Sequence, residues 1–330
     1  MIVAHHYVVN SGLYSVATLD FPSPKSTFLL FFGWAGKTGI DCFLLITGYF
    51  MCKSNISLYK FIKLFGAFYF YKVLFWGIFV VTGYVDFSVR HAVKSLMPFT
   101  SISDGFVSCF LVFFCFIPFL NVLVKSMSKK QHQLLLILCL IAFSIFPQVL
   151  IKVSLNYVGW FMVVYLIGSY FRMYPSQWSL STKKTGLSML CVVALSLLCV
   201  WGGACLSYVT GKNFFYFFVS DANKPLAVAT STCAFLFFKN VKMGYSRVIN
   251  FIAASTFGVL LIHANSDDMR RWLWNDLLDN VGAYSGNVYL HAVLSVLTVY
   301  IVCTLIDALR IHLFEKPLFV ALSRKLQKNL

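Results

Sequence analysis

Two adjacent histidines near the start of the chain are the first side chains that could do chemistry. His5 and His6 stand in the apolar run 2–7. Imidazole titrates near neutral pH, so a histidine here can act as a general base. Successive helix residues point about 100° apart, so one of the two can face the interior of a helical bundle and the other cannot easily join it. A buried neutral histidine bonded to a neighbour is the alternative interpretation.

A second segment, Gly36–Met51, carries Lys37 and Asp41 four residues apart. At this spacing the two side chains can pair on one face of a helix. Gly39 and Gly48 permit close approach of another backbone or of a ligand. One interpretation is an ion pair and small residues that fit this helix into its bundle. The other is that the face lines a polar cavity.

Two ionisable residues lie in apolar runs nearer the end of the chain. His263 closes the run 257–263 at the predicted outer edge, where anchoring at the membrane interface and chemistry are equally good interpretations. Asp307 lies near the inner end of the last run, close to Arg310, and a structural ion pair is preferred there. Charged groups at membrane depth are costly, so each is a functional hypothesis by default.

The chain that must position these residues is strongly apolar. Of its 330 residues, 59% are hydrophobic and 12% are charged, against roughly 25% charged in soluble domains. A soluble protein of this size could not bury so much apolar surface in one core, whereas a bilayer accepts it. The net charge of +16 lies mostly in short clusters between apolar runs. That is the pattern of cytoplasmic loops in contact with anionic lipids, and it argues against a nucleic-acid partner.

The apolar runs predict an all-α, polytopic transmembrane helical bundle of about ten helices, with 1–330 as a single membrane-embedded domain. The predicted spans are Met1–Asn10, Phe28–Met51, Leu64–Tyr84, Phe106–Leu123, Gln133–Ile151, Tyr157–Phe171, Thr185–Ser207, Pro225–Phe238, Phe251–Ala264 and Val288–Leu313. With both termini in the cytoplasm, the inside loops carry about twice as many Lys and Arg residues as the outside loops. The first run is half a span, so we expect the first helix to be truncated.

The ten cysteines mostly sit inside apolar runs, and no Cys-x-x-Cys pair or His–Cys spacing suits zinc. They are interpreted as small packing residues, and no metal site is predicted. The chain also shows no internal or inverted repeat, which is the usual sign of a secondary transporter.

Several of these segments together resemble the acyltransferase 3 family of bacterial membrane acyltransferases, in particular the branch that O-acetylates cell-surface or exported polysaccharides. The first run is similar to the family's first helix, which ends in His or His-His before an aromatic residue. Gly36–Met51 is similar to its second helix, with the pattern G-x-x-G-[VI]-[DE]-x-F-x-x-x-[ST]-G-[YF]-[FL]. Weaker similarities lie at 118–121, 160–170, 257–263 and 314–317. The likeness runs over nearly the whole chain.

The resemblance implies that acetyl-CoA binds from the cytoplasm and that its acyl group passes within the bundle to a carbohydrate hydroxyl on the other side. It implies His6 as the base, and a covalent acyl-histidine step stays open beside direct transfer. The family's Arg, ten residues before this histidine, would fall before Met1. Either the start codon was assigned at an internal Met, which we prefer, or this member has lost that Arg. The family's R-x-x-R pair is replaced by Lys60 and Lys63, which can meet a CoA phosphate as point charges or be ordinary loop charge.

The sequence therefore predicts a membrane O-acyltransferase in the bacterial inner membrane, with acetyl-CoA as donor, a carbohydrate acceptor and an oligomeric state left open. The alternatives are a glycan or lipid exporter without chemistry, and an inactive truncated member of the family. The predicted site residues are His6, His5 and Asp41 for catalysis; Lys60, Lys63 and Lys37 for the acyl donor; and Thr47, Tyr49 and His263 for the substrate cavity.

Overall fold

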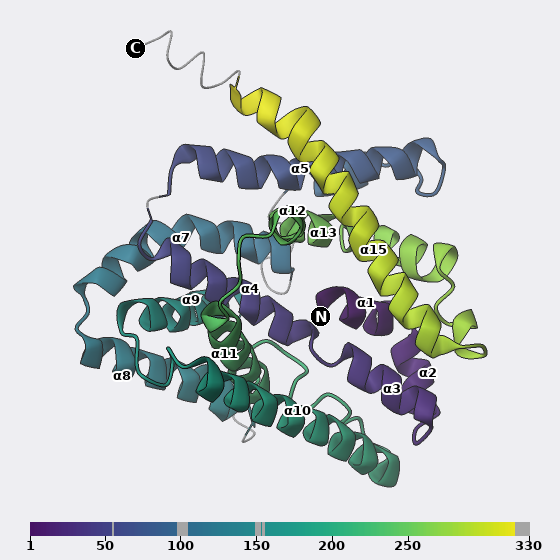
Figure 1. The fold of residues 1–330 in the computed structure, drawn as a ribbon. Coiled ribbons are helices and arrows are strands. Elements are labelled where there is room, and N and C mark those ends of the chain that lie inside the picture. Colours follow the sequence, from purple (N-terminus) through teal and green to yellow (C-terminus); the bar gives the residue numbers. More distant parts are fainter. Residues whose placement is uncertain (55, 98–104, 149–152, 154–155, 321–330) are drawn as a thin grey trace. The chain divides into compact units, whose positions relative to one another are not determined.

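The described part of the protein consists of helices and their connections, without strands, in the computed structural model (Figure 1). The structure describes residues 1–54, 56–97, 105–148, 153 and 156–320. The apolar runs predicted from the sequence lie on helices, except that the last residues of Gln133–Ile151 fall outside the described residues.

The chain forms two compact units. Unit 1 comprises Met1–Leu58 and Met97–Lys242, and unit 2 comprises Tyr59–Leu96 and the chain from Met243 onward. The helices of unit 1 are α1 (Ile2–Val9), α2 (Leu13–Leu19), α3 (Pro24–Gly33), α4 (Gly36–Met51), α7 (Phe106–Ser126), α8 (Lys129–Leu140), η1 (Ile141–Ile145), η2 (Phe146–Gln148), α9 (Tyr157–Met173), α10 (Thr182–Thr210) and α11 (Pro225–Asn240). Those of unit 2 are α5 (Leu58–Val81), α6 (Val89–Leu96), α12 (Arg247–Ala254), α13 (Thr256–His263), α14 (Asp267–Arg271), η3 (Trp272–Leu277), η4 (Gly282–Tyr284), α15 (Val288–Arg310) and η5 (Ile311–Glu315).

Six helical segments of the described chain are long and apolar enough to cross a membrane, so the predicted count of about ten is not confirmed. They are Pro24–Met51, Leu58–Val81, Phe106–Ser126, Lys129–Gln148, Thr182–Thr210 and Val288–Val320. The shorter helices α9 and α11 have 17 and 16 residues. Most of the side chains of α9 are buried, because this helix lies inside unit 1 rather than at its surface.

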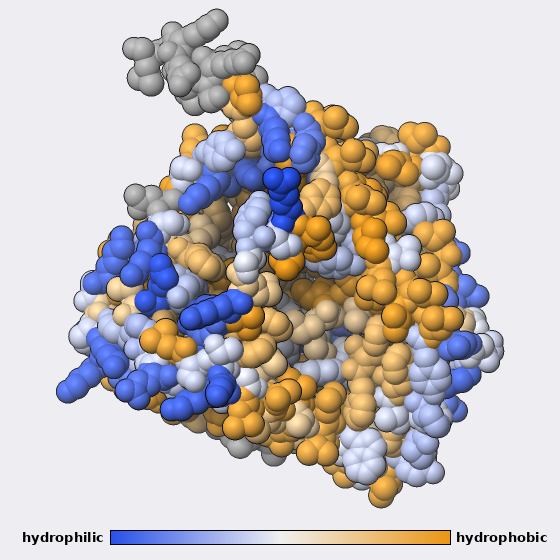
Figure 2. Space-filling model, in the orientation of Figure 1, coloured by the Kyte–Doolittle hydropathy of each residue, from blue (hydrophilic) through white to orange (hydrophobic). Residues whose placement is uncertain are grey.

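The long helices expose more apolar side chains than the surface of a water-soluble protein does. Only 22% of the most apolar window of α5 is buried inside the protein, and the same share holds for α10. Figure 2 shows the result as broad hydrophobic areas on the surface. Exposed leucines over whole helix faces indicate contact with lipid, which supports the membrane location predicted from composition.

Helix α4 is the centre of unit 1, and it packs against α9 and α11. Its crossing with α9 depends on two glycines. A Cβ atom at Gly48 would lie 2.4 Å from the carbonyl oxygen of Tyr165, and one at Gly168 would lie 2.6 Å from that of Leu45. The two backbones therefore approach more closely than any larger residue permits.

The end of α4 is held by α7 and α9. The Asn121 side chain donates hydrogen bonds to the carbonyl oxygens of Met51 (3.0 Å) and Ser54 (3.2 Å). Its own amide oxygen accepts the Tyr165 hydroxyl. Asn121 thus satisfies carbonyls that the end of a helix leaves without partners, and it fixes three helices together.

Candidate active site

His5 is seated in a break between two helices. The predicted span 28–51 is interrupted, since α3 ends at Gly33 and α4 begins at Gly36. Carbonyls in the last turn of a helix have no partner within it. One of them, on Gly33, lies 2.6 Å from Nδ1 of His5. The absence of a side chain at Gly36 makes room for the ring, because a Cβ there would lie 2.1 Å from Cγ of His5.

This contact decides which ring nitrogen of His5 carries the proton. A carbonyl oxygen only accepts hydrogen bonds, so Nδ1 is the donor and, in the neutral ring, Nε2 keeps its lone pair. His6 lies beside it, with the ring centroids 5.9 Å apart. The contacts with Gly33 and Gly36 fix the orientation of the His5 ring and therefore the direction of its Nε2 lone pair.

Asp41 lies on α4 one turn beyond the break and has no exposed surface. Its Oδ1 accepts a hydrogen bond of 3.1 Å from Nε1 of Trp160 on α9. Its Oδ2 is buried without a hydrogen-bond partner among the described residues, as is Oγ1 of Thr38 on the same helix. Buried polar atoms are rarely left unsatisfied, so these two oxygens mark a place where a further polar group fits.

Lys37 does not pair with Asp41, and this part of the sequence prediction is wrong. Its Nζ instead donates to the Tyr157 hydroxyl (2.5 Å) and lies 3.8 Å from Oδ1 of Asp221. Tyr157 in turn donates to the same Asp221 oxygen at 2.8 Å. Tyr157 begins α9 and Asp221 lies before α11, so the fold supplies partners that no local spacing predicts.

These groups form one polar site, defined as His5, Lys37, Asp41, Tyr157 and Asp221. Lys37 acts electrostatically on both His5 and Asp41, and Asp221 also acts on Asp41. The site combines an oriented nitrogen base, a buried carboxylate and an ion pair that is open to solvent, since 47% of the Asp221 side chain is exposed. Such an arrangement can bind a polar acceptor and remove a proton from it.

The two substrate-cavity residues predicted on α4 have other contacts. The Thr47 hydroxyl donates to the Phe43 carbonyl of its own helix at 2.9 Å. Tyr49 lies near the other end of α4, where its hydroxyl accepts a hydrogen bond of 3.2 Å from Arg172. The structure therefore does not place either hydroxyl among the residues of the polar site.

The remaining predicted residues lie in unit 2. Nζ of Lys63 lies 2.8 Å from Oε1 of Glu315, whose other oxygen accepts from Arg310 at 2.7 Å. Lys60 precedes it on α5. His263 is buried, and its Nδ1 lies 2.6 Å from the carbonyl oxygen of Val259. That burial argues against an anchor at the membrane interface.

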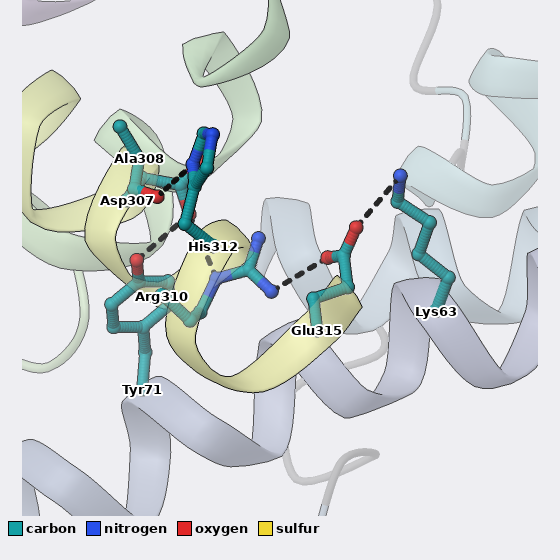
Figure 3. Close-up of polar contacts among 7 residues, drawn as sticks. All are labelled: Lys63, Tyr71, Asp307, Ala308, Arg310, His312 and Glu315. Atoms are coloured by element: carbon teal, nitrogen blue, oxygen red, sulfur yellow. Dashed lines mark hydrogen bonds and ion pairs between the residues drawn. The ribbon is translucent and has the colours of Figure 1, made fainter. Parts of the chain in front are cut away.

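Figure 3 shows the network that contains Lys63 and links α5 to α15 and η5. Asp307 accepts hydrogen bonds from Tyr71 (2.7 Å) and Arg310 (2.9 Å). The ion pair predicted between Asp307 and Arg310 is confirmed.

Sequence reasoning missed Tyr157 and Asp221 as site residues. Neither stands in a distinctive spacing with Lys37, because 120 and 184 residues of chain intervene. Trp160 falls inside the segment 160–170 that was noted for its similarity, but nothing in the sequence connected it with Asp41. The only available signal for Asp221 was the scarcity of acids, since the chain has 11 Asp and Glu residues in total.

The structure thus defines a polytopic helical membrane protein with a polar site formed by α1, α4, α9 and the segment before α11. A family model described as an acyltransferase domain matches residues 1–308, and the chain belongs to this acyltransferase 3 family. No curated protein and no solved structure matches the chain.

A methyl group at Gly36 tests whether the position of the His5 ring matters for activity. The Gly36→Ala methyl group would collide with Cβ and Cγ of His5. These atoms are close to the backbone and cannot move away as the end of a flexible side chain can. Because a misplacement of about 1 Å can cost about 100-fold in rate, we expect a loss of that order in acyl transfer by purified protein. Gly202→Ala on α10 is the matched control, since nothing lies within 4 Å of its Cβ. Full activity in Gly36→Ala would contradict this role.

Proposed function

We propose that the protein is an O-acyltransferase that moves an acetyl or similar acyl group from acyl-CoA to a hydroxyl group of a cell-surface or exported carbohydrate. Membership of the family supports acyl transfer. The observation that carries the finer proposal is the seat of His5, whose Nδ1–H is held by the Gly33 carbonyl while Nε2 remains a base. We therefore assign the general base to His5 rather than to His6, which was favoured from the sequence.

His5 supplies the proton transfer that the reaction needs. Its Nε2 removes the proton of the acceptor hydroxyl as the hydroxyl oxygen forms a bond to the acyl carbon. The carbon–sulfur bond of the thioester breaks, and the proton passes from His5 to the departing thiolate. The products are a carbohydrate ester and free CoA, so no other reactant is required. A thioester is already activated, and a positioned base contributes about 10²- to 10⁴-fold.

Two other parts of the polar site suit the acceptor. Asp221 and Tyr157 offer oxygen atoms that can bind hydroxyl groups, and Lys37 keeps both in place. The buried Oδ2 of Asp41 has no partner among the described residues and can accept a hydrogen bond from a hydroxyl group of the acceptor.

The distribution of charge supports a direction for the reaction. By the positive-inside rule the Arg172 end of α9 faces the cytoplasm. The polar site then lies toward the opposite side of a bacterial inner membrane, where exported carbohydrate is found. Acyl-CoA, made in the cytoplasm, enters from the Arg172 end.

The test is transfer of a labelled acyl group. Membranes that contain the full chain are incubated with radiolabelled acetyl-CoA and the carbohydrate fraction of the host envelope. We expect alkali-labile label in the carbohydrate, at a level well above that of membranes without the protein. Equal label in both membranes would contradict acyl transfer. Export of carbohydrate that does not depend on acetyl-CoA would favour the exporter instead.

A further inference from the structure

Two cations contact one aromatic ring near the end of α4. This end of the helix lies away from the polar site. The guanidinium carbon of Arg172 lies 4.8 Å from the centroid of the Tyr49 ring, and Nζ of Lys239 lies 5.7 Å from it. Arg172 lies in the last turn of α9 and Lys239 in the last turn of α11, so three helices converge here. We define Tyr49, Arg172 and Lys239 as the basic cluster.

The basic cluster has no carboxylate to balance it among the described residues of unit 1. The acids there are Asp20, Asp41 and Asp221. Asp41 and Asp221 belong to the polar site, and Asp20 follows α2, which packs against α1 and α3. More positive charge lies nearby, since Lys53 and Lys125 act with Arg172 on the Cys52 thiol. Figure 2 shows hydrophilic residues gathered on the left of the view, over the connection between α7 and α8.

Arg172 also has unused hydrogen-bonding capacity in a buried position. Its Nη1 donates to the Tyr49 hydroxyl, but its Nε is buried and has no partner among the described residues. Lys239 donates to the Ser179 carbonyl at 3.3 Å. A basic residue is common in the last turn of a helix, where the helix dipole favours it. The same effect favours Lys239 in the last turn of α11. It does not explain why the two cations meet at one tyrosine ring.

We propose that the basic cluster binds a phosphate ester, and that this ester belongs to the CoA of the acyl donor. The inference rests on the proposed function. An arginine fork and a lysine are the side chains that bind phosphate best. Their separation from the polar site also fits. Helix α4 rises by roughly 18 Å between Lys37 and Tyr49 at 1.5 Å per residue. The extended pantetheine arm of CoA is of similar length, so phosphates held at Tyr49 leave the thioester near His5.

The structure favours this cluster over the lysines predicted for the same role. The charge of Lys63 is already balanced by Glu315. A phosphate bound by Lys63 would have to displace that carboxylate, whereas Arg172 and Lys239 have no carboxylate to lose. The donor-binding role thus moves from the loop after the second helix to the ends of α9 and α11.

The experiment measures the binding of CoA, without turnover, to the full-length protein in nanodiscs of neutral lipid. We expect Arg172→Met to raise the Kd for CoA about tenfold or more, because a charge-assisted hydrogen bond is lost. Lys239→Met acts in the same direction, and Arg172→Lys falls between Arg172→Met and the wild type. The matched control is Lys183→Met, which removes an exposed cation at the start of α10. It should leave Kd within about twofold.

The outcomes separate this proposal from the proposed function. If Arg172→Met and Lys239→Met bind CoA as the wild type does while Lys63→Met does not, the cluster is not the donor site, although acyl transfer stands. If the wild type itself fails to bind CoA, the proposed function fails. Thermal unfolding of each variant shows whether it is folded. If Arg172→Met does not fold, the measurement on Lys239→Met still tests the proposal.

A second arm distinguishes CoA from a lipid headgroup as the source of the phosphate. The binding is repeated in nanodiscs that contain phosphatidylglycerol. General repulsion by anionic lipid raises Kd equally in the wild type and in Arg172→Met, and the difference between them persists. If the lipid occupies the cluster, the difference disappears, which would overturn the assignment to CoA.

Discussion

His5→Ala is expected to lower the rate of acyl transfer by about 10²- to 10⁴-fold, because it removes a positioned base. The same change at His6 is expected to cost much less. His5 is the residue whose ring meets the Gly33 carbonyl and fills the space above Gly36. Initial rates of label transfer by each purified variant, at matched protein amounts, give the comparison.

A second substitution separates loss of the base from loss of the fold. The amide of His5→Asn can still donate a hydrogen bond to the Gly33 carbonyl, as Nδ1 does, but it offers no basic nitrogen. We expect this variant to insert and to bind CoA like the wild type, and to be as inactive as His5→Ala. If His5→Asn retains activity while His6→Ala loses it, His6 is the base.

Arg310→Met is expected to destabilise unit 2 by about 3–5 kcal/mol, the cost of removing one partner from a buried ion network. Arg310 pairs with Asp307 and Glu315, and all three side chains are at most 9% exposed. Among the described residues, the substitution leaves buried Asp307 with the Tyr71 hydroxyl as its remaining hydrogen-bond donor. Thermal unfolding of the purified protein in detergent measures the loss as a fall in Tm.

An exposed pair provides the matched control for this change. Arg270 pairs with Asp267 at 2.8 Å, but 95% of the Asp267 side chain is exposed. Exposed pairs of this kind contribute about 0.2–1 kcal/mol, so Arg270→Met should shift Tm little. Equal shifts of Tm in the two variants would show that the buried network in Figure 3 contributes no more to stability than an exposed ion pair does. Replacing Asp307 together with Arg310 by apolar residues should recover part of the loss, since the uncompensated charge is then gone.

The helices and the membrane location follow from patterns that a sequence contains. Apolar runs bounded by basic residues are local features, and a bilayer requires each spanning segment to satisfy its own backbone, which a helix does. The predicted runs therefore lie on helices in the structure. The number of membrane-spanning helices was less predictable. Helix α9, for example, is short, and its side chains are buried by neighbouring helices.

The sequence also identified the segments that build the polar site, but it did not assign their contacts. Gly39 and Gly48 were interpreted as points of close approach, and both are closely approached in the structure. Gly39 meets the Ile2 side chain of α1, and Gly48 meets the Tyr165 backbone of α9. The close contact of Gly36 with His5 was not predicted. The pairing of Lys37 with Asp41 was geometrically possible and did not form, because Trp160 covers Asp41 and Tyr157 with Asp221 attracts Lys37.

The adjacent histidines of the run 2–7 show most clearly what the sequence determines and what the tertiary structure determines. By itself the sequence determined that two imidazoles stand in an apolar run of a chain of this family, because residue type and local hydropathy are properties of the chain. Only the tertiary structure showed that the His5 ring contacts the Gly33 carbonyl and that the contact is made through Nδ1. That contact depends on a carbonyl released where α3 ends, 28 residues later in the chain, and contacts over such separations are set by packing.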